Sequence, residues 1–157
     1  MQRPRTVAAF VFRGRFRVDR GGRGTLVVPW EESDISAVPN KTYYDLVREA
    51  KSRVAELSVQ DTARILGEQP GTVILDCREP NESSLGTIAG AVVIPRGILE
   101  SNIERVASRD QKVIIYCAGG NRSALAADTL REMGYSDVAT MAGGFRAWID
   151  MGGDVDF

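Results

Sequence analysis

The sequence of 157 residues contains no histidine and only two cysteines, Cys77 and Cys117. The absence of histidine excludes a Ser-His-Asp triad, a Cys-His dyad and every zinc site with imidazole ligands. Two cysteines cannot supply a four-thiolate metal site within one chain, and we expect neither a metal nor an organic cofactor. So few cysteines in a chain of this size are typical of a reducing compartment, which favours the cytoplasm.

Long apolar runs are also missing from the sequence. No stretch approaches the roughly 20 residues that a membrane-spanning helix needs, and the early run over residues 7–12 is too short for a secretory signal. The net charge is only −1, which gives no general argument for binding nucleic acid. We therefore expect no membrane or nucleic-acid partner. The composition, 43% hydrophobic and 26% charged, is that of one globular domain with a short extension.

The charge is uneven, because residues 1–30 carry seven arginines and a single acidic residue, Asp19. A basic arm for an acidic partner, a transit peptide and a tail that joins no core are all compatible with this composition. We favour the tail, although weak apolar alternation around Phe10 and Val18 also allows a short hairpin. Residues 31–40 have the composition of a linker. We predict a basic, poorly ordered extension over 1–40 and a domain over 41–157.

From residue 41 onward, amphipathic helices alternate with short buried strands. Apolar residues at helical spacing predict a helix over about 42–56 with one face toward a core. Its paired Tyr43 and Tyr44 could form a binding handle, but packing in the core and at its boundary is the interpretation we favour. Further helices are expected over 58–66, 98–107, 122–133 and 144–150, and strands over 72–76, 91–94, 112–116 and 138–141. This order predicts an α/β domain with a central, mostly parallel sheet flanked by helices.

The residues best suited to catalysis lie in the turn before the helix over 122–133. In an open parallel sheet, ligands bind beyond the carboxyl ends of the strands, and Cys117 follows the most hydrophobic strand. Gly119 and Gly120 let the loop turn inward and direct successive N–H groups at one point, beside a helix N-terminus. A thiolate or persulfide there would be stabilised without a histidine. Arg122 would add a cation at the rim or buttress the loop.

Each cysteine also has a purely structural interpretation, since a free cysteine is commonly a small buried apolar residue. A cysteine followed by two glycines and an arginine at a helix start is an unusual choice for packing, so we favour a nucleophile at Cys117. For Cys77, which ends a strand between Asp76 and Arg78, the preference reverses. Plain packing is favoured there, and a resolving thiol that forms a disulfide with Cys117 is the alternative.

Four motifs in order resemble the rhodanese-like sulfurtransferase family. Residues 117–122 match its C-x-x-G-x-R pattern, and residues 76–80 match D-x-R-E-P. Residues 86–95 match a G-H-I-x-G-A segment followed by I-P, and residues 143–155 match a signature of G-G, W and G-x-V. The resemblance covers about 58–157 and implies the family's three-layer fold. The helix before it is similar to an addition found in some single-domain bacterial members of the thiosulfate sulfurtransferase type.

The resemblance implies that Cys117 takes the outer sulfur of thiosulfate or of a persulfide donor, becomes a persulfide and passes the sulfur to a thiol or cyanide. A persulfide-carrying protein is a further candidate donor. The loop that binds the sulfur is then Ala118, Gly119, Gly120, Asn121, Arg122 and Ser123, with backbone N–H groups as the stabilising donors. Asp76 and Arg78 are implied to support the base of the site through hydrogen bonds, with a surface or helix-capping ion pair as the alternative.

Three positions depart from the family's pattern. Thr87 replaces a histidine, which implies the loss of a structural hydrogen bond, and Asp154 stands where many members have proline. Ala118 occupies a position that is often arginine in members that use thiosulfate. Losing a cation beside a dianion weakens the case for thiosulfate as the donor, so a protein or low-molecular-weight persulfide is an equal candidate.

Two other functions remain open. Tyrosine phosphatases of similar fold and arsenate reductases use C-x5-R, whereas Cys117 and Arg122 give C-x4-R, a loop one residue shorter that suits a single sulfur atom better than phosphate. Rhodanese-like domains also serve as binding or regulatory modules. Those modules usually lose the cysteine, which this chain keeps, and fold alone does not decide function.

Overall fold

The computed structural model of the chain describes residues 15–18, 21–22, 24–27 and 40–157. The chain divides into two units, 1–40 and 41–157, and each is described by itself. In the first unit, β1 (Arg15–Val18) and β2 (Gly24–Val27) pair antiparallel, which is the hairpin that the apolar alternation allowed. The poor order expected of the rest of this extension, and its linker, lie outside the described residues.

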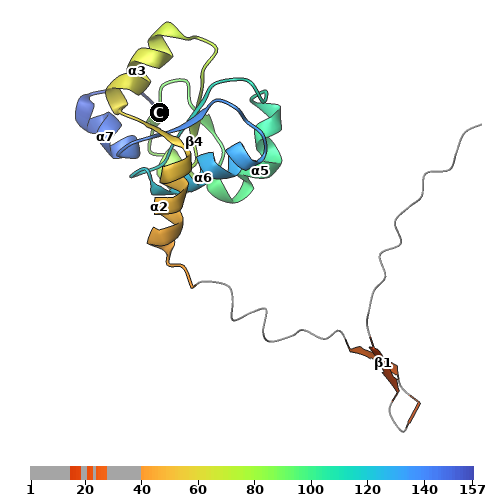
Figure 1. Ribbon diagram of the computed structural model, residues 1–157. Coiled ribbons are helices and arrows are strands. Elements are labelled where there is room, and N and C mark those ends of the chain that lie inside the picture. Colours follow the sequence, from red (N-terminus) through yellow and green to blue (C-terminus); the bar gives the residue numbers. More distant parts are fainter. Residues whose placement is uncertain (1–14, 19–20, 23, 28–39) are drawn as a thin grey trace, which may run out of the picture. The chain divides into compact units, whose positions relative to one another are not determined.

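Five strands of the second unit, among them the strand labelled β4 in Figure 1, form one parallel sheet. Their order in the sheet is β3-β8-β7-β4-β6. In chain order they are β3 (Ala55–Leu57), β4 (Val73–Asp76), β6 (Val92–Val93), β7 (Val113–Tyr116) and β8 (Val138–Met141). The central strand, β7, is buried along its whole length, which explains its unbroken run of apolar residues. A separate antiparallel pair consists of β5 (Thr87–Ile88) and β9 (Val155–Asp156).

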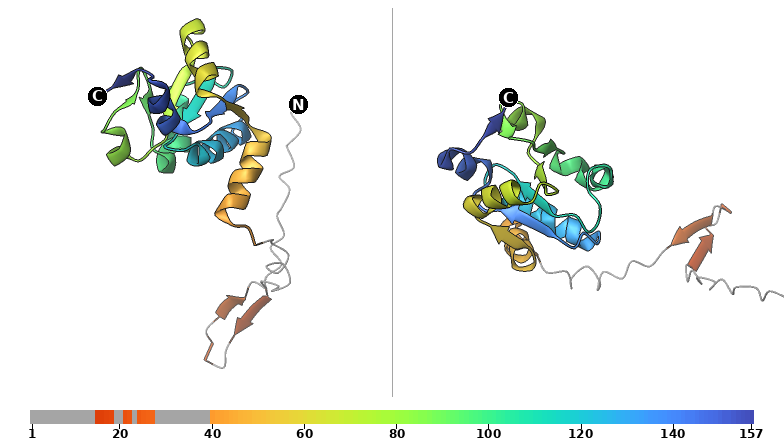
Figure 2. Two further views of the ribbon diagram at one scale, coloured as in Figure 1. Left: turned by 90° about the vertical axis from the view of Figure 1, so that its left-hand side faces the viewer. Right: turned by 90° about the horizontal axis from the view of Figure 1, so that it is seen from above.

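Helices cover both faces of the parallel sheet (Figure 2). They are α2 (Tyr43–Arg53), α3 (Val59–Glu68), α4 (Pro80–Ser83), α5 (Leu99–Asn102), α6 (Asn121–Glu132) and α7 (Gly144–Met151), with 3-10 turns η1 (Arg96–Ile98) and η2 (Ile103–Arg105). Neighbouring residues of β7 join opposite cores: Ile115 packs in the cluster that contains Leu130 of α6, and Ile114 in the cluster that contains Trp148 of α7. The predicted α/β fold with a central parallel sheet between helices is confirmed. Among the described residues, no helix is both long and apolar enough to span a bilayer.

Most of the predicted elements are present within one or two residues of their expected bounds. The strands over 72–76, 91–94, 112–116 and 138–141 are β4, β6, β7 and β8, and the helices over 122–133 and 144–150 are α6 and α7. The helix expected from residue 58 is α3, whose Ser58 side chain accepts the N–H of Asp61 at 3.0 Å. Such a cap satisfies one free N–H of the first turn.

The leading helix is shorter than the prediction of 42–56. It ends at Arg53, and residues 55–57 form β3, which pairs in parallel with β8. Leu57 fits a helical period and a half-buried strand equally well, so the pattern alone merged the two elements. The helix expected over 98–107 is also wrong as one element, because η1, α5 and η2 divide this segment into short turns.

The two tyrosines of α2 do not pack in the core, contrary to the favoured interpretation. Tyr43 is 48% exposed and Tyr44 is 71% exposed, whereas Val47 and Ala50 supply the buried face of the helix. α2 packs through this face beside α6 (Figure 1). Tyr43 therefore remains available to line a surface cavity next to the N-terminal end of α6.

Candidate active site

Cys117 lies at the carboxyl edge of the sheet, between the central strand β7 and helix α6. Its side chain is 2% exposed. It lines a cavity of about 300 Å³ together with Tyr43, Gly119, Asn121, Arg122 and Arg146. The position agrees with the general rule that ligands of open parallel sheets bind beyond the carboxyl ends of the strands.

Hydrogen-bond donors converge on the sulfur of Cys117. The N–H of Gly120 donates to Sγ at 3.1 Å, and the hydroxyl of Ser123 donates to it at 3.6 Å. The Ser123 oxygen in turn accepts a hydrogen bond of 2.7 Å from the hydroxyl of Thr140 on β8, which orients the Ser123 proton toward the sulfur. Gly120 has a φ of 93°, a left-handed conformation that suits glycine. These contacts favour an anionic sulfur.

The surroundings lower the pKa of Cys117 well below the ordinary thiol value near 8.5. The largest cause is a hydrogen bond from the thiol of Cys77, which outweighs the opposite effect of burial; the N–H and hydroxyl of Ser123 and the N–H of Gly119 add to the lowering. The pKa of Cys77 is raised in return by the interaction with Cys117 and by burial. The opposite directions of the two pKa shifts, with the donors from Gly120 and Ser123, favour Cys117 as the thiolate of the pair and Cys77 as its protonated partner.

The first turn of α7 fixes the direction of the peptide groups in the loop. The N–H of Phe145 donates to the carbonyl of Cys117 at 2.7 Å, and the N–H of Arg146 donates to the carbonyl of Ala118 at 3.3 Å. In a trans peptide the C=O and N–H groups point in opposite directions. The carbonyls that face α7 therefore turn the following amides away from it, and the amide of Gly119 faces the sulfur.

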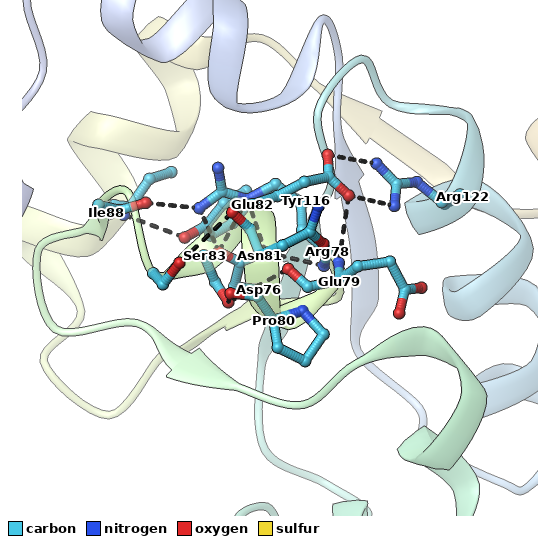
Figure 3. Close-up of polar contacts among 12 residues, drawn as sticks. Asp76, Arg78, Glu79, Pro80, Asn81, Glu82, Ser83, Ile88, Tyr116 and Arg122 are labelled. Atoms are coloured by element: carbon cyan, nitrogen blue, oxygen red, sulfur yellow. Dashed lines mark hydrogen bonds and ion pairs between the residues drawn. The ribbon is translucent and has the colours of Figure 1, made fainter.

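Arg122 is held at the rim of the cavity by Glu82 of α4. Its Nη1 and Nη2 donate to Oε2 and Oε1 of Glu82 at 2.7 and 2.8 Å (Figure 3). The bond to Arg122 is the largest cause that lowers the pKa of Glu82 to about 2, and it raises the pKa of Arg122. Because a carboxylate balances the guanidinium, Arg122 ties α6 to α4 and does not offer the cavity an unpaired charge.

Arg146 is a cation of the site that the sequence did not reveal. It lines the same cavity as Cys117. In the part of the chain that the structure describes, its side chain has no ion pair or hydrogen bond. It comes from α7, which follows β8, the neighbour of β7 in the sheet. Gly143 and Gly144 mark the turn between β8 and α7 in the sequence. The sequence does not show the strand order that brings Arg146 to the cavity of Cys117.

Asp76 and Arg78 form a buried ion pair (Figure 3). The pair lies on the face of the sheet opposite Cys117, because Leu75 and Cys77 belong to the core cluster of Cys117 and Tyr116 belongs to the other. Their side chains are 0% and 4% exposed, so the pair does not lie at the surface. Nη2 of Arg78 donates to Oδ2 of Asp76 at 2.6 Å and to the carbonyl of Gly86 at 2.7 Å. The guanidinium lies 3.9 Å from the centroid of the Phe145 ring. The pair thus reaches the loop through Phe145, whose N–H holds the carbonyl of Cys117.

The predicted loop lies beside the sulfur of Cys117, and its residues have different roles in the site. Gly119, Gly120 and Ser123 direct N–H or O–H groups at Sγ, Asn121 and Arg122 line the cavity, and Ala118 is bound to α7 through its carbonyl. The sequence did not single out Thr140, Glu82, Arg146 or the cavity-lining role of Tyr43 as parts of the site.

Comparison with known proteins points to one family. A family model for the rhodanese-like domain matches residues 58–151. The uncharacterized protein YqhL of Bacillus subtilis is 39% identical over 75 residues, 48% of this chain and 59% of YqhL, so the chain spans less than two thirds of that relative. The thiosulfate sulfurtransferase GlpE of Pseudoalteromonas translucida is 37% identical over 93 residues, 59% of this chain and 86% of GlpE. A solved structure from Rhodopseudomonas palustris, RPA3614, named a possible tyrosine phosphatase, is 36% identical with a TM-score of 0.69, and the match covers 76% of this chain and 97% of that one.

Proposed function

We propose that this chain, which belongs to the rhodanese-like domain family, moves a sulfane sulfur from an anionic donor to a thiol or to cyanide through a persulfide on Cys117. A role in sulfur transfer follows from the family and its sulfurtransferase relatives. The persulfide, the donor and the acceptor are our proposal. One observation carries it: the sulfur of Cys117, in a cavity wall, accepts hydrogen bonds from Gly120 and Ser123.

In the first step, the Cys117 thiolate attacks the outer sulfur of thiosulfate. The S–S bond of the donor breaks, sulfite leaves with the electron pair, and Cys117 becomes Cys–S–S⁻. The negative charge moves from Sγ to the outer sulfur, where fixed N–H groups of the loop stabilise it without having to reorganise. In the second step, an acceptor thiolate or cyanide attacks the outer sulfur and restores the Cys117 thiolate. Neither step requires a histidine base.

Arg146 supports an anionic donor. The loop has Ala118 where members that use thiosulfate often have arginine, but Arg146 of α7 lines the same cavity. A cation beside Cys117 attracts thiosulfate and also the negative sulfur of a low-molecular-weight or protein persulfide. Both cysteines are free thiols, and we place the reaction in the cytoplasm, where such thiols stay reduced.

Phosphate chemistry is the rival to be tested, because the solved relative from Rhodopseudomonas palustris is named a possible tyrosine phosphatase. A phosphatase loop needs its arginine to bind phosphate oxygens. Here both Nη atoms of Arg122 are bound by Glu82, and the loop is one residue shorter than C-x5-R. These features favour a single sulfur atom as the transferred group. A pure binding module would not need the anionic sulfur that the site favours.

The test is the initial rate of thiocyanate formation from thiosulfate and cyanide, measured beside the hydrolysis of an aryl phosphate. We expect thiocyanate from the wild-type chain, no phosphate release, and no activity in Cys117→Ser. Full sulfur transfer by Cys117→Ser would overturn the mechanism. Hydrolysis of the aryl phosphate that depends on Cys117, without thiocyanate, would assign the site to the rival chemistry.

A further inference from the structure

The two cysteines occupy matching positions on neighbouring strands. β4 and β7 pair in parallel with Asp76 opposite Tyr116, and the pairing continues one residue further, because the N–H of Cys77 donates to the carbonyl of Tyr116 at 3.0 Å. Cys77 therefore lies beside Cys117, and both side chains belong to the same core cluster. Neighbouring strands lie about 4.8 Å apart, within the Cα separation of about 4.4–6.8 Å that a disulfide requires.

The two thiols differ in access. Cys77 is 0% exposed and is not part of the cavity wall, whereas Cys117 is part of that wall. A donor or acceptor that enters the cavity therefore meets Cys117 first. The groups that Cys77 can react with are those that Cys117 carries.

We infer that Cys77 is a resolving thiol that converts the Cys117 persulfide into a Cys77–Cys117 disulfide and releases the outer sulfur as sulfide. This inference rests on the persulfide proposed above. The sulfur of Cys77 attacks Sγ of Cys117, the bond from Sγ to the outer sulfur breaks, and that sulfur leaves as HS⁻ with the proton of Cys77. The outer sulfur is reduced to sulfide while the two cysteines are oxidised, so the step needs no other oxidant. A small dithiol then reduces the disulfide and restores both thiols.

The resolving thiol gives the persulfide two competing fates. An acceptor in the cavity attacks the outer sulfur and carries it away as a sulfane, whereas Cys77 attacks the inner sulfur from the interior of the domain and releases sulfide. The concentration of the acceptor sets the balance between the two. Without an acceptor, the chain becomes a dithiol-dependent source of sulfide from thiosulfate.

The test uses the full chain, reduced, freed of reductant and kept without oxygen, with one equivalent of thiosulfate and no acceptor. Sulfite, sulfide and the intact protein mass are measured. Cys77→Ser is the matched variant, because a serine hydroxyl can still donate to the Cys117 sulfur but cannot form a disulfide, and Cys77→Ala is a second variant should the buried hydroxyl disturb folding. A sample of the wild-type chain without thiosulfate controls for adventitious oxidation.

We expect the wild-type chain to release one equivalent each of sulfite and sulfide and to lose about 2 Da, the mass of the two thiol hydrogens. We expect Cys77→Ser to release sulfite, keep a gain of about 32 Da and yield no sulfide. A stable gain of one sulfur in both chains, without sulfide, would overturn the resolving role and leave the proposed function standing. Absence of sulfite and of any mass gain in every chain would instead overturn the proposed function and, with it, this inference.

Discussion

Gly144 lies so close to Cys117 that a Cβ atom on Gly144 would be 2.2 Å from the carbonyl oxygen of Cys117. No real side chain fits at that distance. Gly144 also has a φ of 58°, a conformation that costs other residues about 1–2 kcal/mol. This contact lets the first turn of α7 approach the loop and bind its carbonyls. The conformation of the reactive loop is therefore fixed by a neighbouring helix, α7, whereas the hydrogen bonds to the sulfur come from Gly120 and Ser123.

Replacing Gly144 by alanine should damage both the fold and the site. We expect Gly144→Ala to lower the free energy of unfolding by about 2–4 kcal/mol, because overpacking adds to the cost of the positive φ. Displacement of the loop should lower the rate of thiocyanate formation about 100-fold. Urea denaturation and the thiosulfate–cyanide assay measure the two effects.

Gly67 offers the matched control, because it is an exposed helical glycine with no atom within 4 Å of an added Cβ. Gly67→Ala should raise the free energy of unfolding by about 0.5–1 kcal/mol and leave the rate unchanged. Equal behaviour of the two variants would contradict the role given to Gly144.

The ionisation of Cys117 should depend on Cys77. A thiolate is present above its pKa and disappears as the pH falls through it, so the lowered pKa keeps Cys117 ionised at neutral pH and below. Ultraviolet absorbance of the thiolate measures this titration. We expect Cys77→Ala to move the midpoint upward, toward about 8.5, and Cys77→Ser to move it less. The acid titration should vanish in Cys117→Ser, and an unchanged midpoint in Cys77→Ala would refute the dependence.

Arg146 should determine the affinity for an anionic donor more than the rate of transfer. We expect Arg146→Gln to raise KM for thiosulfate about fivefold, with a smaller change in kcat, and the effect should shrink as ionic strength rises. Arg105→Gln makes the same change of net charge on η2, outside the cavity lining, and should leave KM unchanged. Equal values of KM for wild type and Arg146→Gln at low ionic strength would contradict the assignment.

Residues 41–157 should fold and act without the extension, because they contain both core clusters and every residue of the cavity. We expect deletion of 1–40 to leave Tm and the thiocyanate rate unchanged. Deletion of 1–53 also removes α2, its buried Val47 and Ala50, and the ion pair of Arg53 with Asp128. That chain should lose about 10 °C or more in Tm. Calorimetry measures Tm for both shortened chains. A large loss of Tm on deletion of 1–40 alone would place the domain boundary before residue 41.

The sequence predicted the position of the reactive cysteine because the signals there are local. Four apolar residues give β7, two glycines interrupt the pattern, and a strong helical period gives α6, so Cys117 had to lie at the carboxyl end of a buried strand. The same local signals predicted the bounds of β8 to the residue. Where two elements join without a turn residue, as at Val54 between α2 and β3, the pattern could not separate them.

The parts of the site that the sequence missed depend on strand order. Thr140 reaches Ser123 because β8 lies beside β7, and Arg146 lines the cavity because α7 follows β8. No local pattern encodes which strands are neighbours. The pairing of Cys77 with Cys117 has the same origin, since it requires the register of β4 against β7. From the sequence, a disulfide between the two cysteines was only the alternative to plain packing of Cys77. The pairing of the strands places the two residues side by side.

The cavity wall joins Tyr43, the loop after β7 and Arg146, segments that are separated by most of the domain's length. Contacts between such distant segments form late, after the loops between them have closed. A nascent chain that has not yet released α7 from the ribosome lacks the bonds that orient the loop amides. The loop amides therefore take up their orientation toward the cysteine sulfur only after α7 has been synthesised and has packed against the loop.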